Sequence, residues 1–253
     1  MRAKRVDFGH NKQTKLFNGL DVEIPRGQIT TIIGPNGCGK STLLGVLTKA
    51  YKVQDGEVFL GDKNVDQIKR KAFSQKVAVL HQHHPEELDL TVEKLVAHGR
   101  TPYEGLGQKA DHNKEEIVNW ALACTGLTDL RERSLSQLSG GQRQRAWLAM
   151  ALCQKPDILF LDEPTTYLDI YYQIELLELV KELNEKYKMT IVMVLHDLNQ
   201  ALNYSHHIIV MKDGKILRKG KPIEMIDCQL IKEVYGINGT FHEADGKYYL
   251  LPY

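Results

Sequence analysis

The stretch 34–42 has the spacing of a phosphate-binding loop, G-x-x-x-x-G-K-[ST]. Its members are Gly34, Pro35, Asn36, Gly37, Cys38, Gly39, Lys40, Ser41 and Thr42. The glycines let the backbone curl, so that successive N–H groups and the positive end of the following helix face one anion. Lys40 would then contact the β- and γ-phosphates of a nucleotide, and the Ser41 hydroxyl would bind Mg²⁺. The alternative, a chance glycine-rich turn, is disfavoured by the strand-like and helix-like flanks.

Two adjacent acids, Asp162 and Glu163, follow the apolar run 158–161, which the sequence predicts as a buried strand. Open parallel sheets bind ligands at the carboxyl ends of their strands, so these acids are expected at the binding edge. Asp162 suits coordination of Mg²⁺ through water, and Glu163 suits orienting or deprotonating an attacking water. His196 follows the next apolar run, 190–195. A lone histidine is usually structural, but one at this position can reach the γ-phosphate and the water.

A second glycine-rich segment opens a predicted helix over 142–152. Its members are Leu138, Ser139, Gly140, Gly141 and Gln142. One nucleotide needs one phosphate-binding loop, so a single chain leaves this second segment without a ligand. A simple N-cap turn is one interpretation, and anion binding at a helix N-terminus is the one that we favour.

The elements that must position these residues are strands and helices of an α/β domain. The β-branched run 29–33 predicts a buried strand before the loop, and the apolar positions of 43–47 predict a helix after it. Alternating patterns in 1–24 and the turns within 53–65 predict antiparallel strands. From 88 to 136 the periodicity becomes helical, with a helix from Thr91 to Ala97 and another over 115–122 around a loop at 99–107. We therefore expect an antiparallel β subdomain and an inserted helical subdomain.

Composition limits the function classes. The chain has 253 residues, with 33 Lys and Arg against 32 Asp and Glu, so its charge gives no argument for nucleic acid or anionic lipid as the main partner. No apolar stretch is long enough to cross a membrane, and we expect no signal peptide. Four scattered cysteines without metal-ligand spacing suggest a reducing compartment. These features predict a soluble cytosolic chain, even if it works at a membrane.

Two local clusters have open interpretations. His81, His83 and His84 invite a metal site, but no second ligand cluster completes one, and Gln82 between them is the more informative residue. Phe8 lies at the end of a predicted strand, where an aromatic ring either stacks on a purine or packs in the core.

These motifs, in this order, resemble the nucleotide-binding subunit of an ABC transporter, and the resemblance covers roughly residues 5–235. It implies a P-loop NTPase (RecA-like) fold, ATP hydrolysis, and ATP and Mg²⁺ as ligands. It also implies a role for Gln82 as the Q-loop glutamine, for 138–142 as the signature sequence, for Asp169 as the D-loop aspartate and for His196 as the switch histidine.

By the same resemblance, several residues acquire catalytic or binding roles. The expected catalytic residues are Glu163, His196 and Gln82, and the expected Mg²⁺ ligands are Ser41, Gln82 and Asp162. Residues 34–42 and Phe8 would bind ATP, with Phe8 standing where the family commonly has Tyr. Asp169 and the signature would contact ATP held by a partner chain, because such subunits resemble a head-to-tail dimer.

The resemblance further implies partners and a location. A second copy, membrane permease subunits that dock on the helical subdomain, and indirectly an extracytoplasmic substrate-binding protein are expected, with the chain at the cytoplasmic face of the membrane. No nucleic-acid partner is expected. The ABC ATPase domain is predicted over 1–235, with the helical insertion at about 86–154 and a C-terminal β extension over 236–253.

The amino-acid sequences of several motifs are similar to those of ATPases of ferric-siderophore importers. These segments are 81–84, 98–103, 138–147, 165–170 and 195–200. Importers of vitamin B12 and haem are closely related, so the same motor role for those cargoes stays an alternative. A soluble ABC ATPase acting on nucleic acid is less favoured, because the chain has one cassette, no heptad array and almost no net charge. A non-hydrolysing subunit is disfavoured because all expected catalytic positions are filled.

Overall fold

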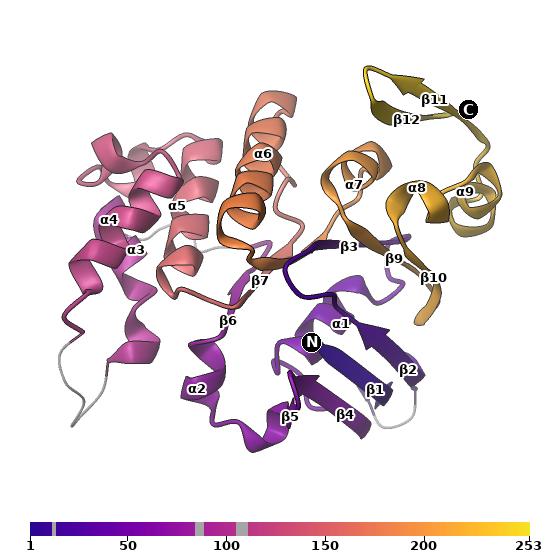
Figure 1. Cartoon of the computed structure of the whole chain (residues 1–253), viewed down its shortest axis with the longest axis horizontal. Helices are drawn as coiled ribbons and strands as arrows, with labels where there is room; N and C mark the ends of the chain where they lie inside the picture. The colour runs from indigo at the N-terminus through magenta and orange to yellow at the C-terminus, as the bar shows by residue number, and fades with distance from the viewer. Residues whose placement is uncertain (12–13, 84–88, 105–110) are drawn as a thin grey trace. The chain divides into compact units, whose positions relative to one another are not determined.

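The computed structural model describes residues 1–11, 14–83, 89–104 and 111–253. The chain forms two compact units, which are taken separately below. One unit contains Met1–Gln67 and Thr190–Tyr253, and the other contains Ile68–Met189. Figure 1 labels their helices and strands along the chain. His84 of the histidine cluster and positions 105–107 of the predicted loop lie outside the described residues.

The first unit begins with an antiparallel sheet of strand order β2-β1-β4-β5. Its strands are β1 (Arg2–Phe8), β2 (Phe17–Glu23), β4 (Asp55–Leu60) and β5 (Lys63–Asn64), and a 3₁₀ turn, η1 (Val65–Gln67), follows. Val6 of β1 pairs with Leu20 of β2, and both side chains are buried. Since side chains of a strand alternate between the faces of the sheet, the alternating sequence gives this sheet one apolar face. The predicted antiparallel strands are confirmed.

Parallel strands form the rest of the sheet structure in this unit. The strand β3 (Ile29–Ile33) pairs in parallel with β8 (Thr190–Val194) on one side and with β9 (His207–Lys212) on the other. β10 (Lys215–Gly220) extends β9 in antiparallel fashion. Every residue of β3 and β8 is buried, which explains why both read as continuous apolar or β-branched runs. The helix α1 (Lys40–Leu47) begins seven residues after β3 ends.

The C-terminal part of the first unit consists of short helices and a hairpin. The helices are α7 (Leu198–Tyr204), α8 (Pro222–Met225) and α9 (Cys228–Tyr235), and the hairpin strands are β11 (Gly239–Ala244) and β12 (Lys247–Pro252). The hairpin turns at Asp245 and Gly246, both at positive φ, which matches the right-handed twist of its strands. Figure 1 shows the hairpin beyond α7 and α9.

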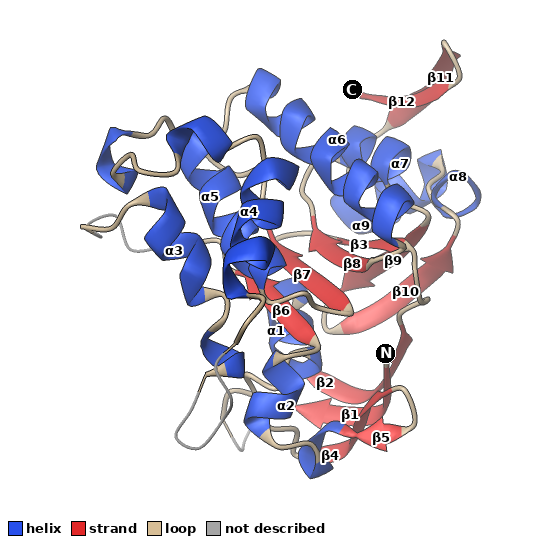
Figure 2. Cartoon of the chain, turned by 60° about the vertical axis from the view of Figure 1, so that its left-hand side comes forward, coloured by secondary structure: helices blue, strands red, loops and turns tan. Residues whose placement is uncertain are grey.

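The second unit contains the parallel strands β6 (Val77–Leu80) and β7 (Ile158–Asp162), paired from Val77 opposite Ile158 to Leu80 opposite Leu161. Its helices are α2 (Arg70–Ser74), α3 (Val92–His98), α4 (Lys114–Cys124), α5 (Gly140–Cys153) and α6 (Ile170–Tyr187), with 3₁₀ turns η2 (Thr101–Tyr103), η3 (Thr128–Leu130) and η4 (Leu135–Gln137). The helices α3, α4 and α5 pack against one another, as Figure 2 shows.

Local sequence explains where these helices begin. Thr91 caps α3, because its side chain accepts a hydrogen bond from the Lys94 N–H group, as the sequence predicts. The apolar faces of α3, α4 and α5 then supply a buried core that includes Leu95, Leu122 and Leu148. The predicted helical insertion falls in this unit, and its exact limits stay a prediction. Among the described residues, no helix combines the length and the apolar character that crossing a membrane requires.

Candidate functional site

The loop between β3 and α1 folds back around the side chain of Lys40. This side chain is only 5% exposed, and its ammonium donates hydrogen bonds of 2.9 Å to the Gly34 carbonyl and 3.1 Å to the Pro35 carbonyl. The two acceptors are neutral, whereas a buried cation is stabilised most by an anion. The first turn of α1 contains no acidic residue, so its positive end is not neutralised from within the helix. This loop is therefore suited to bind phosphate.

Two glycines make this loop geometry possible. Gly39 precedes α1 with a φ of 105°, and a Cβ atom there would come within 2.8 Å of the Phe17 ring. Gly34 has a φ of 151°, and a Cβ atom there would come within 2.2 Å of the Met211 carbonyl oxygen. A side chain at either position would be both strained and obstructed. The sequence pattern thus reflects real steric limits on the loop.

Cys38 lies inside the loop and is buried, with 3% exposure. Burial raises the pKa of its thiol, and the positive charge of Lys40 opposes that shift. Its carbonyl accepts a hydrogen bond from the Gly214 N–H group at 3.0 Å. Cys38 therefore serves the loop as a small apolar residue with a structural backbone contact.

An exposed aromatic ring beside the loop belongs to His10, a residue that the sequence pattern did not indicate. Its Nε2 atom lies 3.4 Å from the Thr42 hydroxyl oxygen. Phe8, predicted to stack on adenine, is instead 5% exposed, and its ring stacks on Tyr51 with centroids 5.4 Å apart. Period-two alternation could have indicated this, because Phe8 follows Val6 on the buried face of β1.

Two side chains of the second unit form hydrogen bonds with Glu163, the carboxylate predicted to be catalytic. It directly follows β7, whose last residue is Asp162. The Gln82 side-chain amide donates a hydrogen bond of 2.6 Å to the Glu163 carboxylate, and the Thr166 hydroxyl donates a second of 3.3 Å. Glu163 has a positive φ of 50°, an unusual backbone conformation that is enriched at functional positions. The structure thus brings together two of the three residues predicted to be catalytic.

The third, His196, lies in the first unit. It is exposed and comes two residues after β8. Asp197 caps α7, because its carboxylate accepts hydrogen bonds from the N–H groups of Asn199 and Gln200 at 2.7 and 3.0 Å.

The signature segment opens α5 with a capping box. The Ser139 hydroxyl accepts from the Gln142 N–H group at 3.2 Å, and the Gln142 side chain accepts from the Ser139 N–H group at 3.1 Å. The spacing S-x-x-Q is a sequence signal for this motif, and the structure shows the N-cap turn, while anion binding at this helix terminus stays a prediction. Gly140 is exposed with open space around it, whereas a Cβ atom on Gly141 would come within 2.5 Å of the Tyr172 ring. Leu138 is buried below them.

Asp169 has a local role as well. It caps α6 by accepting a hydrogen bond from the Tyr172 N–H group at 3.2 Å. The ring of Tyr172 also lies against Gly141, so this residue connects the start of α6 to the start of α5.

The chemistry of the predicted metal ligands fits Mg²⁺. Ser41, Gln82 and Asp162 offer a hydroxyl, an amide and a carboxylate oxygen, and Mg²⁺ takes few protein oxygens together with phosphates and water. The amide nitrogen of Gln82 is engaged with Glu163, which leaves its oxygen to act as a ligand. In the described part of the chain, no group of three or more His, Cys, Asp or Glu side chains could hold a metal ion, so neither His81 nor His83 belongs to such a group.

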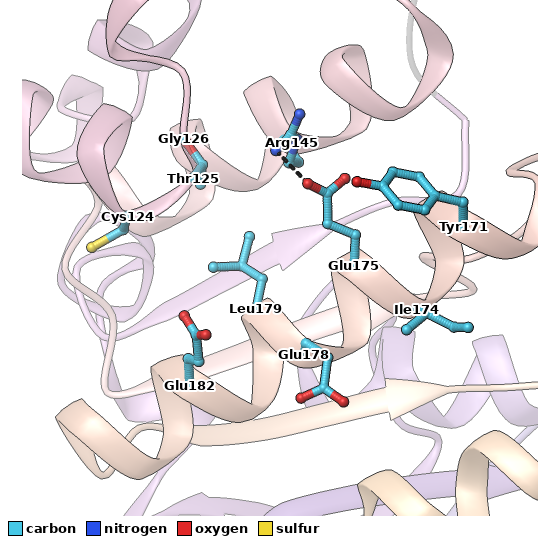
Figure 3. Close-up of a pocket in the computed structure, with 10 residues that line it drawn as sticks. All are labelled: Cys124, Thr125, Gly126, Arg145, Tyr171, Ile174, Glu175, Glu178, Leu179 and Glu182. Carbon is cyan, nitrogen blue, oxygen red and sulfur yellow. Dashed lines mark hydrogen bonds and ion pairs between the residues drawn. The ribbon is translucent and has the colours of Figure 1, made fainter.

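Figure 3 shows a cavity of about 430 Å³ in the second unit, between the end of α4, α5 and α6. Arg145 and Glu175 form an ion pair of 3.0 Å across it. Tyr171 and Ile174 contribute exposed apolar surface beside it. The described residues that line this cavity include none of the predicted ATP or Mg²⁺ ligands.

Comparison with known proteins agrees with these motifs. A family model described as ABC transporter matches residues 17–166, which include the phosphate-binding loop, Gln82, the signature and both acids. The petrobactin import ATP-binding protein FpuC of Bacillus anthracis is 41% identical over 250 residues, 99% of this chain and 92% of FpuC. The ferric enterobactin transport ATP-binding protein FepC of Escherichia coli (strain K12) is 45% identical over 237 residues, 94% of this chain and 87% of FepC.

A solved structure extends the similarity to the fold. It is the dimeric structure of the ATP-binding cassette MJ0796 in a post-hydrolysis state bound to ADP and Pi. The two chains are 27% identical with a TM-score of 0.73, and the similarity covers 87% of this chain and 98% of the MJ0796 chain. The predicted α/β fold of a nucleotide-binding cassette is therefore confirmed.

Proposed function

Since this chain belongs to the ABC transporter family, as an ATPase subunit, we propose that it drives the import of ferric siderophores. The observation that carries the proposal is the similarity, at 41% and 45% identity over nearly the whole chain, to FpuC, named for petrobactin import, and to FepC, named for ferric enterobactin transport. The same motor role in vitamin B12 or haem import is the alternative that the test below separates.

We propose that the phosphate-binding loop holds the triphosphate of ATP. Lys40 now bonds to two neutral carbonyls of its own loop, and phosphate oxygens would replace them with stronger charge-assisted hydrogen bonds. The exposed ring of His10 beside Thr42 replaces Phe8 as the proposed surface for adenine. Bound Mg²⁺, held by Ser41, Gln82 and Asp162, would neutralise phosphate charge.

Glu163 is proposed to orient and deprotonate the attacking water. Its carboxylate is held from two directions, by Gln82 and Thr166, and this preorganisation suits a general base. His196 is proposed to contact the γ-phosphate. Gln82 is proposed to sense that phosphate, because a change in its position would alter the hydrogen bond to Glu163.

A second copy is proposed to complete each site. The signature and Asp169 would then contact ATP bound to the partner's loop, in a head-to-tail dimer. The dimeric structure of the MJ0796 cassette, bound to ADP and Pi, supports the pairing of two copies. Closure of the dimer would act on the membrane permease subunits, and an extracytoplasmic binding protein would deliver the cargo to them. The chain would lie peripherally at the cytoplasmic face of the membrane. A nucleic-acid partner is not proposed, given a net charge of +1.

The test is uptake of radiolabelled ferric siderophore, with labelled cobalamin and haem in parallel, in cells whose only copy carries Lys40→Ala. Lys52→Ala is the control, because Lys52 is exposed on the surface of the same unit. We expect selective loss of iron uptake with Lys40→Ala alone. Loss of cobalamin or haem uptake instead would show that the cargo is that compound and not a ferric siderophore. Unchanged uptake of all three compounds would refute the transport role.

A further inference from the structure

The C-terminal hairpin needs support from outside itself, because two isolated strands are marginally stable in water. β11 occupies one edge of β12, from Gly239 opposite Pro252 to Ala244 opposite Lys247. The opposite edge of β12 presents the N–H and C=O groups of Tyr248 and Leu250. A buried or half-buried strand edge must find hydrogen-bond partners for such groups.

Two asparagines of α7 supply these partners. The Asn199 side chain accepts from the Leu250 N–H group at 2.7 Å and donates to the Leu250 carbonyl at 3.2 Å. The Asn203 side chain accepts from the Tyr248 N–H group at 3.2 Å and donates to the Tyr248 carbonyl at 2.9 Å. Each side-chain amide therefore pairs with one residue of β12 as a neighbouring strand would.

The spacing of helix and strand makes this pairing possible. Residues four apart in a helix lie about 6 Å apart along its axis. Residues two apart in a strand lie about 6.8 Å apart and point to the same edge. Asn199 pairs with Leu250 and Asn203 with Tyr248, so α7 runs antiparallel to β12 and the two repeats nearly match. We name these four hydrogen bonds the asparagine clamp.

Apolar packing reinforces the asparagine clamp. Leu250 is 3% exposed and belongs to a buried cluster with Ala201 and Leu202 of α7. The same cluster contains Ile33, the last residue of β3 before the phosphate-binding loop, and Leu198 packs against it. The hairpin thus contributes to the same core as α7 and the last residue of β3.

The asparagine clamp acts on the first turn of α7. Asn199 is held twice, since its N–H group donates to the Asp197 carboxylate at 2.7 Å while its side chain holds Leu250. His196 directly precedes that cap. A displacement of the hairpin would therefore reach His196 through two residues of chain.

Resting on the function proposed above, we propose that Asn199 and Asn203 are positioning residues, and that the hairpin 239–252 sets the place of His196 through α7. His196 would then contact the γ-phosphate only while the asparagine clamp is closed. Substrate binding, which depends on the phosphate-binding loop, would be affected less than turnover.

The test measures kcat and KM for ATP in the full chain carrying Asn199→Ala and Asn203→Ala together, with and without His196→Ala. We expect the asparagine pair to lower kcat about tenfold, with KM changed less than about twofold, because a small misplacement of a reacting group costs this much. In the His196→Ala background we expect no further decrease, because the effect acts through that side chain. An equal decrease in both backgrounds, or none in the first, would overturn the proposal.

Leu251→Ala is the matched control, since Leu251 is 53% exposed and lies on β12 beside Leu250. A second measurement, the NMR resonance of the His196 ring, assigned with His196→Ala, is expected to shift with either single asparagine variant and not with Leu251→Ala. An unshifted resonance in folded Asn199→Ala would also overturn the proposal. Lys40→Ala distinguishes failure of the positioning role from failure of the proposed function. If Lys40→Ala abolishes ATP hydrolysis but the asparagine variants do not change it, only the positioning role is refuted. If Lys40→Ala leaves ATP hydrolysis unchanged, the proposed function is refuted.

Discussion

The Gln82 side-chain amide donates a hydrogen bond of 2.6 Å to the Glu163 carboxylate, although 81 positions separate the two residues in the chain. β6 and β7 pair in parallel, and each of these residues follows the carboxyl end of one of the two strands. The contact joins the residue proposed to sense the γ-phosphate to the residue proposed to activate water. Movement of Gln82 would therefore change the orientation of Glu163.

Glu163→Gln is expected to retain ATP binding and lose hydrolysis. The amide keeps the size of the side chain but cannot accept a proton from water, so the rate of phosphate release should fall about a hundredfold or more. Size-exclusion chromatography with ATP is expected to show a trapped dimer. Glu182→Gln, on the exposed surface of α6, is the control. Hydrolysis by Glu163→Gln at the wild-type rate would refute the role of Glu163.

His10→Ala is expected to weaken ATP binding, because the exposed ring beside Thr42 is the proposed adenine surface. Loss of one stacked ring should raise the KM for ATP about tenfold. Phe8→Leu should instead lower the melting temperature with little change in KM, since Phe8 is buried. The opposite pattern of KM changes would restore the original interpretation of Phe8.

Local pattern was sufficient to predict much of this molecule. The strand β3, the glycines of the loop and the helix α1 are adjacent in sequence, so their spacing alone defines the phosphate-binding loop. The apolar runs of β7 and β8 likewise place Glu163 and His196 just beyond strand ends, and the cap at Asp197 follows from its residue type.

Contacts between distant segments could not be predicted in the same way. The hydrogen bond between Gln82 and Glu163 depends on strand pairing, and the asparagine clamp depends on the packing of a hairpin on a helix, with Asn199 and Leu250 51 positions apart in the chain. The sequence left two interpretations of Phe8, purine stacking and core packing, and the burial of Val6 and Phe8 on the same face of β1 favours core packing.

Gly34→Ala is expected to damage the loop far more than Gly37→Ala. A Cβ atom on Gly34 would approach the Met211 carbonyl oxygen to 2.2 Å, whereas one on Gly37 would meet no described residue other than its chain neighbours within 4 Å. Both glycines have positive φ, at 151° and 77°, so Gly37→Ala should cost only about 1 kcal/mol of strain. Urea unfolding and ATP binding of the two variants test this order. Equal losses of stability and ATP affinity in both variants would contradict it.

The four cysteines are expected to react unequally with maleimide. Burial raises the pKa of the Cys38 thiol, and burial raises that of Cys153 to about 11, so at about pH 8 both thiols stay protonated and inert in the folded chain. Cys228 is exposed and should react first. Mass spectrometry of the alkylated chain measures this order, and labelling of Cys38 and Cys153 should require unfolding.

The same burial predicts a pH dependence of stability for Cys153. Because its folded pKa of about 11 lies above the ordinary thiol value of 9.0, the unfolded thiol ionises first. The stability that this group contributes is therefore present below about pH 9 and is lost as the pH rises toward 11. Cys153→Ala should show a smaller loss of stability over this range, and an equal loss would contradict the assignment.

The ion pair of Arg100 with Asp111 is expected to matter more for stability than any surface pair of the second unit. Arg100 Nε lies 2.7 Å from the Asp111 carboxylate, with side chains only 4% and 14% exposed. The guanidinium also donates to the Cys153 carbonyl at 2.9 Å and lies 3.7 Å from the centroid of the Tyr103 ring. Arg100→Ala would leave Asp111 without its cation and should cost about 3–5 kcal/mol of unfolding free energy.

The control for this prediction is the pair of Lys114 with Glu104, which is 2.7 Å long but has side chains 43% and 50% exposed. Solvent screens such a pair, so Lys114→Ala should cost less than about 1 kcal/mol. The double variant Arg100→Met with Asp111→Leu should be more stable than Arg100→Ala, because it leaves no unpaired buried charge. Urea unfolding of the four chains provides the comparison, and a double variant less stable than Arg100→Ala would show that the cost comes from lost packing on Tyr103 and lost hydrogen bonding to Cys153 and not from charge.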